Sequence, residues 1–289
     1  MKTINPLGIH AAVFVGDLKP ESCEIAARRA AGCGFDVLEL PVFETEAVNP
    51  DELRLILQDH GLVGVCSLGL DFDADISSTD SAIVSRGEAR LRSAIEVAAG
   101  LGGSFLGGVI YSALGKYDRP PEAAGRDAMV SCLRRLAMQA ADRGVVLGLE
   151  AVNRYESNII NTCRQAVEVI EEVGLQNIVV HLDSYHANLE EISFAQAVSD
   201  CGKHLGYVHI GESHRGYLGT GSVDLDGLFT ALHGANYEGK ITFESFSRAV
   251  LSPDLSNRLA IWRNLWTDGD DLARKAHAYM SERLSAGQH

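Results

Sequence analysis

Eight short apolar runs recur along the sequence, and this recurrence limits the possible folds more than any other feature. Several runs are apolar at consecutive positions, as in Val145-Val146-Leu147, which is typical of strands covered on both faces of a sheet. We therefore expect eight strands, at Leu7–Phe14, Asp36–Leu40, Leu62–Leu70, Ser104–Ile110, Val145–Ala151, Ile178–Asp183, Gly206–Ile210 and Lys240–Phe246.

Segments with the spacing of amphipathic helices separate these runs. The clearest are Pro20–Ala31, Ser81–Ala99, Asp127–Arg143, Cys163–Val173 and Phe194–Cys201. Regular alternation of strand and helix predicts parallel strands joined by crossover helices. Eight such units without a break favour an α/β fold, a single closed (β/α)8 or TIM barrel. An open doubly wound sheet is the second candidate, but the segment after the first run lacks the glycine-rich fingerprint of its nucleotide-binding versions.

The chain of 289 residues is long enough for one such barrel, so residues 1–289 are expected to form one domain. The segment from Leu255 onward has the pattern of a long helix with the pair Trp262 and Trp266. We expect this C-terminal helix to pack on the barrel, or to contact an oligomer partner, because aromatic residues are enriched at interfaces.

Charge and cysteine content restrict the partners and the compartment. The formal net charge of −14 disfavours binding to nucleic acid or to anionic membranes. The six cysteines are scattered without a CxxC pair, which is typical of reduced thiols. Neither a signal peptide nor a membrane-spanning run is visible, so we expect a cytoplasmic protein.

Four successive expected strands end in side chains that can bind a metal ion. These are Glu150, Asp183, His209 and Glu244. In a barrel, the carboxyl ends of the strands meet at one rim, where barrel enzymes hold their catalytic groups. One carboxylate at a strand end is often a helix cap or loop anchor, but four in succession favour a shared site. Three carboxylates and one imidazole suit Mn²⁺, Mg²⁺ or Co²⁺ better than structural zinc.

Further polar residues follow the same strands. His181 has the parity of Asp183 and points to the same side, either as a support of the site or as a filler of a barrel layer. His186 and Arg215 lie beyond their strands, where a substrate hydroxyl could be reached; for Arg215, a surface salt bridge is the alternative interpretation. The glycine-rich loop Gly211–Gly221 is a weak indication of phosphate binding and is equally explained by tight turns.

At these residues the chain resembles the ketose 3-epimerases, the D-tagatose, D-allulose (D-psicose) and L-ribulose 3-epimerase family of the xylose isomerase-like TIM barrel group. The resemblance covers nearly the whole chain. The matching stretches are GLEAVNRYESNIINT from Gly148, HLDSYHANLEE from His181, VHIGESHRGYLGTG from Val208, TFESFS from Thr242, GVIYSALGKY from Gly108 and IWRNLW from Ile261.

The resemblance implies one divalent ion per subunit, with Mn²⁺ the first expectation and Mg²⁺ or Co²⁺ the others. It implies Glu150, Asp183, His209 and Glu244 as metal ligands and Glu150 and Glu244 as the acid/base pair. It also implies Glu156, His186 and Arg215 as substrate-binding residues, and a homodimer or homotetramer. Phe14 stands where the family often has tryptophan. The pocket wall is expected from Phe14, Cys66 and Gly107–Ile110.

The expected reaction is epimerisation at C3 of a free ketose, by deprotonation and reprotonation through a metal-bound cis-enediolate. Inversion needs a base on one face of the sugar and an acid on the other, and two glutamates on separate strands supply both. Other candidates are an aldose–ketose isomerase, a hydroxypyruvate isomerase or an inosose dehydratase of the same barrel group. A sugar-binding protein without turnover is the candidate from another class.

Overall fold

The expected parallel barrel is present in the computed structural model, which describes residues 5–286. The strands are β1 (Leu7–His10), β2 (Val37–Pro41), β3 (Val63–Ser67), β4 (Phe105–Gly107), β5 (Val146–Glu150), β6 (Ile178–Asp183), β7 (Leu205–Ile210) and β8 (Lys240–Phe243). Each strand pairs in parallel with the next, and β8 pairs with β1, which closes the barrel. Residues 1–4 and 287–289 of the expected domain lie outside the described residues.

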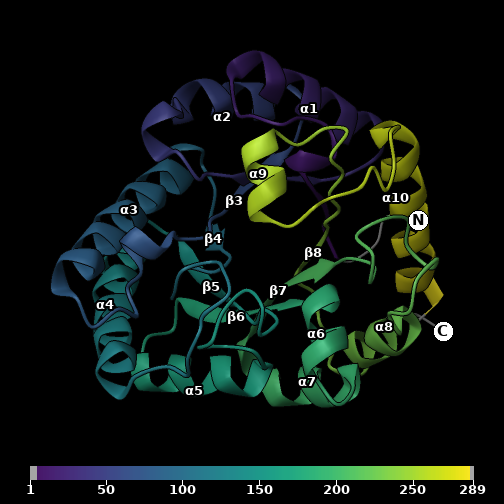
Figure 1. The fold of residues 1–289 in the computed structure, drawn as a ribbon. Coiled ribbons are helices and arrows are strands. Elements are labelled where there is room, and N and C mark those ends of the chain that lie inside the picture. The colour runs from purple at the N-terminus through teal and green to yellow at the C-terminus, as the bar shows by residue number, and fades with distance from the viewer. Residues whose placement is uncertain (1–4, 287–289) are drawn as a thin grey trace.

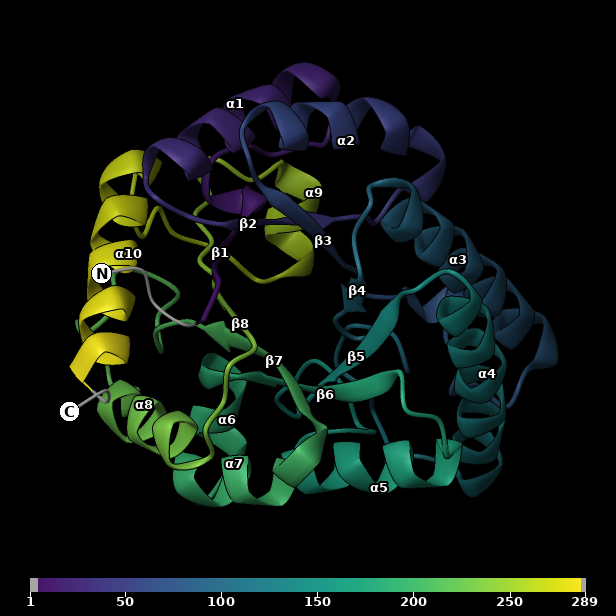
Figure 2. The same cartoon turned by 180° about the vertical axis from the view of Figure 1, so that it is seen from behind.

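Helices surround the barrel on its outside (Figures 1 and 2). They are α1 (Pro20–Gly32), α2 (Pro50–Asp59), α3 (Ser81–Gly100), α4 (Ala123–Asp142), α5 (Cys163–Val173), α6 (Ser184–Glu190), α7 (Phe194–Cys201), α8 (Leu225–Gly234) and α10 (Gly269–Ala286), while α9 (Pro253–Arg258) lies over one end of the barrel. Short 3₁₀ helices occupy Ala11–Val13, Thr45–Ala47, Phe72–Ala74 and Gly202–His204. None of the helices in the described part of the chain is long and apolar enough to span a bilayer.

Local sequence signals mark the ends of several helices. Thr162 and Gln165 form a reciprocal capping box that begins α5, and Gly174 in the left-handed conformation (φ 73°) ends it. Asn49 caps α2, and Pro50 follows as the first helical residue, where its missing N–H costs nothing. These signals explain why α5 begins and ends at the expected residues.

The inside of the barrel is filled by side chains. Val37, Val65, Phe105 and Tyr207 form a buried cluster, in which the rings of Phe105 and Tyr207 stack with their centroids 4.2 Å apart. Gly148 of β5 leaves room for this stack, because a Cβ at that position would lie 2.3 Å from Phe105 Cζ. This part of the barrel is therefore packed with side chains.

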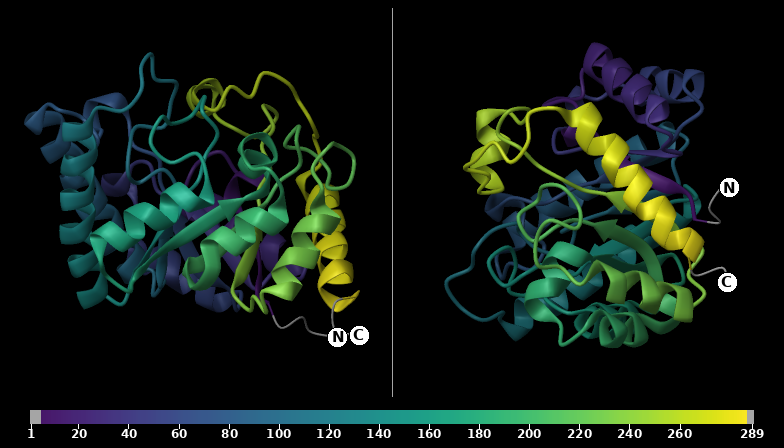
Figure 3. Two further views of the ribbon diagram at one scale, coloured as in Figure 1. Left: turned by 90° about the horizontal axis from the view of Figure 1, so that it is seen from below. Right: turned by 90° about the vertical axis from the view of Figure 1, so that its right-hand side faces the viewer.

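The loops after the carboxyl ends of the strands and helix α9 lie at one end of the barrel, whereas β1 begins and α10 ends at the other (Figure 3). Arg258 ties α9 to this rim through hydrogen bonds to the carbonyls of Gly69 (2.9 Å) and Leu70 (3.0 Å) and an ion pair with Asp71 (2.9 Å). Helix α10 contacts α8 and buries Leu272, Ala276 and Met280 in the main core.

The expected strands Leu62–Leu70, Ser104–Ile110 and Lys240–Phe246 end earlier, at Ser67, Gly107 and Phe243, and two other expectations about element boundaries are wrong by more. The apolar run at Leu7–Phe14 is a strand only to His10, because the chain then turns into the 3₁₀ helix Ala11–Val13. The predicted long helix from Leu255 is instead the short α9, an irregular stretch and α10. Ala260 lies in the left-handed region (φ 54°) and ends the helical path.

The two tryptophans of this C-terminal segment have different surroundings. Trp266 is 4% exposed, and its indole N–H donates to Ser245 Oγ at 2.7 Å, which pulls the segment back onto the barrel. Trp262 is 62% exposed and does not pack on the barrel; the alternative expectation, contact with an oligomer partner, stays a prediction for this residue.

Candidate active site

Four side chains converge at the carboxyl ends of β5 to β8. Glu150 and Asp183 are the last residues of β5 and β6, His209 is the second-last residue of β7, and Glu244 directly follows β8. The Nδ1 atom of His209 lies 3.5 Å from Asp183 Oδ2, 3.5 Å from Glu244 Oε1 and 3.8 Å from Glu150 Oε1. The structure thus places the four predicted ligands around one point, in a setting where all four are buried.

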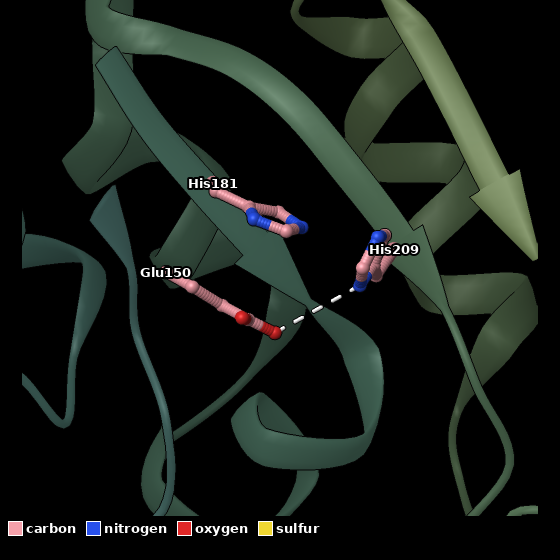
Figure 4. A group of neighbouring side chains, drawn as sticks. All are labelled: Glu150, His181 and His209. Atoms are coloured by element: carbon pink, nitrogen blue, oxygen red, sulfur yellow. Dashed lines mark ion pairs between the residues drawn. The ribbon is translucent and has the colours of Figure 1, made fainter. Parts of the chain in front are cut away.

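His181 lies in the same group, as Figure 4 shows with Glu150 and His209. Its ring stands perpendicular to that of His209, with centroids 4.1 Å apart, and it also contacts Tyr207 edge-on at 5.0 Å. Neither of its ring nitrogens has a hydrogen-bond partner among the described residues. Burial lowers the pKa of His181 well below its usual value, so the ring is neutral and fills the barrel layer under the site.

The residues fit a divalent cation. His209 Nδ1 is buried and has no hydrogen-bond partner among the described residues, although carboxylate oxygens of three side chains lie nearby. Separations of 3.5 to 3.8 Å are too long for hydrogen bonds but leave space for an ion between the four atoms. Three carboxylates and one imidazole form the oxygen-rich donor set that Mn²⁺ and Mg²⁺ accept.

The two glutamates have unusual protonation behaviour. Burial raises the pKa of Glu150 well above its usual value, and the carboxylates of Glu244 and Asp183 add to the rise against the opposing charge of His209. Burial also raises the pKa of Glu244. Burial would raise the pKa of Asp183 as well, but Arg215, His186 and His209 hold it below its usual value. The pair Glu150 and Glu244 can therefore carry a proton that Asp183 cannot.

Arg215 lies inside the site and not in a surface salt bridge. Its Nη1 donates to Glu244 Oε2 and contacts Asp183 Oδ2 at 3.4 Å. Its guanidinium carbon lies 3.8 Å above the Tyr185 ring, which holds the side chain in place. Arg215 has a left-handed backbone (φ 58°), an uncommon conformation that the surrounding loop must stabilise.

The ring of His186 has polar neighbours at both of its nitrogens. The backbone N–H of Asn153 donates to His186 Nδ1 at 3.1 Å, and the Asn153 side chain lies 2.8 Å from the same atom. On the other side of the ring, Nε2 lies 3.3 Å from Arg215 Nη2 and 3.9 Å from both Glu150 Oε1 and Glu156 Oε2. Asn153 Nδ2 also donates to Glu156 Oε1 at 2.9 Å, so it organises both predicted substrate-binding residues.

A cavity opens next to these groups, lined by all the predicted site residues except the buried Asp183. Of the expected wall residues, Gly108 and Val109 line it, but Phe14 and Cys66 are not among its lining residues. That expectation is wrong for these two because β1 ends before Phe14 and the side chain of Cys66 lies on the outer side of β3 in the main core. The apolar lining residues that sequence reasoning missed are Phe43, Leu68, Leu114, Val152, Phe246, Leu255 and Leu259.

The loop Gly211–Gly221 is organised by a buried carboxylate. Glu212 is fully buried, and its Oε1 accepts the N–H groups of Ser213 (2.8 Å) and Val223 (3.1 Å) while its Oε2 accepts that of Gly219 (3.1 Å). Backbone N–H groups that face a carboxylate of the chain itself are not available to a phosphate. The weak indication of phosphate binding in this loop is therefore replaced by a structural function.

The closed parallel barrel and the cluster of side chains at its rim place this chain in a class of proteins: barrels that can hold a divalent cation at the carboxyl ends of their strands. Residues 27–282 match the model of the family described as Xylose isomerase-like TIM barrel. The chain is 47% identical to an L-ribulose 3-epimerase of Methylomonas sp. (strain DH-1), over 96% of each chain. It is 44% identical to a ketose 3-epimerase of Arthrobacter globiformis, over 97% of each chain.

Solved structures give the same grouping. A D-allulose 3-epimerase from Methylomonas sp. in complex with D-allulose superposes with a TM-score of 0.95 at 46% identity, over 98% of each chain. The chain belongs to the Xylose isomerase-like TIM barrel family and, within it, to the ketose 3-epimerases.

Proposed function

We propose that this protein epimerises free ketoses at C3 with the help of one divalent cation. The observation that carries the proposal is the placement of Glu150 and Glu244, which come from different strands and both approach His209 Nδ1. Binding of a sugar alone would not need a proton-transfer group on each side. The named relatives, an L-ribulose 3-epimerase and a ketose 3-epimerase, support the same reaction.

The cation would be held by Glu150, Asp183, His209 and Glu244, and we propose Mn²⁺ as the resident ion because the donor set is rich in oxygen. When bound, it supplies Lewis-acid stabilisation of negative charge that develops on the oxygens at C2 and C3 of the ketose.

In this proposal Glu150 and Glu244 carry out the two proton transfers. One carboxylate takes the C3 proton, the C3–H electron pair enters the C2–C3 bond of a planar cis-enediolate, and the other carboxyl group returns a proton to the opposite face. Among the described residues no hydrogen bond reaches Glu150 Oε2, so this oxygen is available for the proton. Glu244 Oε2 accepts from Arg215, which stabilises the ionised form of that side chain.

The remaining predicted contacts orient the sugar. His186 offers Nε2, Glu156 offers carboxylate oxygens, and Arg215 offers further N–H groups from a rigid position above Tyr185. Hydrogen bonds from these groups fix the hydroxyls of the sugar so that C3 stays between the two glutamates. The entropy cost of reaching the reactive geometry is then met when the sugar binds. We propose these three as substrate-binding residues.

The decisive experiment replaces each glutamate in turn. Glu150→Gln and Glu244→Gln keep the shape of the side chain but remove the proton carrier, so each should lower kcat by at least about a hundredfold while the barrel stays folded. The conversion of D-fructose, D-tagatose and L-ribulose is followed by product analysis. Near wild-type turnover in either variant would contradict the two-base scheme.

Solvent deuterium provides an independent check on the same scheme. Proton abstraction and return through side chains should place deuterium at C3 of the product in heavy water. An aldose–ketose isomerase would give a different product, and a hydride shift would leave C3 without solvent deuterium.

Oligomer and compartment are also proposals. We propose a homodimer or homotetramer, supported by the exposed apolar residues Trp262 and Ile192, of which Ile192 is 95% exposed. We propose a cytoplasmic location, supported by six cysteines that are all free thiols. Light scattering after size-exclusion chromatography tests the first proposal, and cell fractionation tests the second.

A further inference from the structure

Glu39 is a buried carboxylate that the proposed reaction does not use. It lies in the middle of β2 between Leu38 and Leu40 and is 1% exposed. Its Oε2 is 2.8 Å from His209 Nε2 and 2.8 Å from the Tyr207 hydroxyl. A carboxylate inside a barrel costs free energy unless its partners compensate for the lost water, so this placement calls for an explanation.

The direction of these hydrogen bonds can be derived. An ionised carboxylate only accepts, so the Tyr207 hydroxyl donates to Glu39, and the Thr242 hydroxyl, 2.6 Å from the Tyr207 oxygen, donates to Tyr207 in turn. By the same argument His209 Nε2 carries a hydrogen and donates it to Glu39. The lone pair of a neutral His209 ring is then at Nδ1.

Nδ1 is the atom that faces the other three predicted ligands. It lies 3.5 Å from Asp183 and from Glu244 and 3.8 Å from Glu150, and no described residue donates to it. The hydrogen bond to Glu39 and the edge-on contact with His181 hold the ring in this orientation. If the ring turned over, Cε1 would face Glu39 and Cδ2 would face the three carboxylates, so the predicted ligand set would lose its nitrogen donor.

We propose that Glu39 is a positioning residue that sets the tautomer and orientation of His209 for metal binding. It does not touch the substrate, and its effect reaches the reaction only through His209. Partners of this kind typically change metal affinity or activity by about 10- to 100-fold. The inference rests on the proposed function insofar as it assumes a cation at this site.

The test measures Mn²⁺ binding by isothermal titration calorimetry, without any sugar present. Glu39→Gln keeps the size and one acceptor oxygen but removes the charge, and Glu39→Met removes the acceptor. We expect the Kd for Mn²⁺ to rise about 10-fold in the first variant and about 100-fold in the second. Tyr207→Phe is the matched control, because it removes the other donor to Glu39 and leaves the His209 hydrogen bond; its Kd should stay near the wild-type value.

A second measurement separates positioning from damage to the fold. Excess Mn²⁺ should restore kcat of Glu39→Gln toward the wild-type value, with KM for the ketose unchanged, since the substrate contacts remain. Folded Glu39 variants that bind Mn²⁺ like the wild type would overturn the inference. Loss of turnover that saturating Mn²⁺ does not restore would overturn it as well.

The outcomes also separate this inference from the proposed function. If the wild type bound no divalent cation, the metal-dependent function itself would fail. If the wild type bound Mn²⁺ and epimerised ketoses while all three variants bound it equally well, only the assignment of Glu39 would fail.

Discussion

At the residue scale, His10 shows how burial beside the site determines a protonation state. Its Nδ1 accepts the Ala12 N–H at 3.2 Å, and its ring contacts Phe246 edge-on at 5.5 Å. Burial lowers the pKa of His10 from 6.5 to about 4, against the attraction of Glu39. The ring is therefore neutral in the folded protein at neutral pH and presents a polar but uncharged group to the cavity.

This shift predicts a pH dependence of stability. Between about pH 6.5 and about pH 4 the unfolded chain binds a proton at His10 that the folded protein does not, so the free energy of unfolding falls as the pH falls through this window. The loss from this residue is about 3 kcal/mol at most. Urea unfolding at a series of pH values should give a flatter profile for His10→Asn, whose side-chain oxygen still accepts the Ala12 N–H. Parallel profiles of wild type and variant would rule the shift out.

The close packing around Gly148 predicts the effect of a substitution on stability. Alanine there would bring its Cβ to 2.3 Å from Phe105 Cζ, and Phe105 cannot move away because it stacks on Tyr207. Overpacking of this kind costs about 1–3 kcal/mol. Gly148→Ala should therefore lower the free energy of unfolding, as measured by urea titration. Gly32→Ala, where nothing lies within 4 Å of the added Cβ, is the control and should lose nothing. Equal effects of both substitutions would contradict the packing argument.

At the element scale, the loop after β7 depends on Glu212 for its shape. The carboxylate accepts three backbone N–H groups, and the Glu212 carbonyl accepts the Arg215 N–H at 2.7 Å, so it also supports the uncommon backbone of Arg215. Burial would raise the pKa of Glu212, but these backbone N–H groups lower it, so the side chain is ionised at neutral pH.

Removal of the Glu212 carboxylate should therefore impair substrate binding more than folding. Glu212→Ala leaves several buried N–H groups without an acceptor, each at a cost of about 1–3 kcal/mol unless the loop opens to water. We expect a higher KM for the ketose and faster proteolysis within residues 213–222. Glu212→Gln keeps one acceptor oxygen and should be intermediate. An unchanged KM together with unchanged proteolysis in Glu212→Ala would show that the loop holds its shape by other means.

At the scale of the whole molecule, the predicted metal centre joins four strands that are distant in sequence. A cation bound to the folded state alone stabilises it by about 2.7 kcal/mol at a concentration one hundred times the Kd. Treatment with EDTA should thus lower Tm by about 5 °C and abolish turnover, and added Mn²⁺ should restore both. Calorimetric scans with and without Mn²⁺ measure the shift; an unchanged Tm in a protein shown to bind Mn²⁺ would contradict the linkage.

Much of this architecture follows from the order of residues alone. Apolar runs with intervening amphipathic segments determine eight strands and their helices, because burial on both faces requires that pattern. Parallel strands of one barrel deliver their carboxyl ends to the same rim. The positions of Glu150, Asp183, His209 and Glu244 at four strand ends were therefore sufficient to place them together.

Tertiary structure decided what depends on distant partners. Glu39 lies inside an apolar run, where sequence indicates only a buried strand, and its function appears once β2 and β7 place it 2.8 Å from a ring 170 residues away. Asn153, the apolar walls and the folded-back Trp266 likewise depend on contacts across the barrel. The periodicity of apolar residues in the sequence indicates which face of a helix or strand is buried. The hydrogen-bond partner of each buried polar atom depends on which strands become neighbours in the closed barrel.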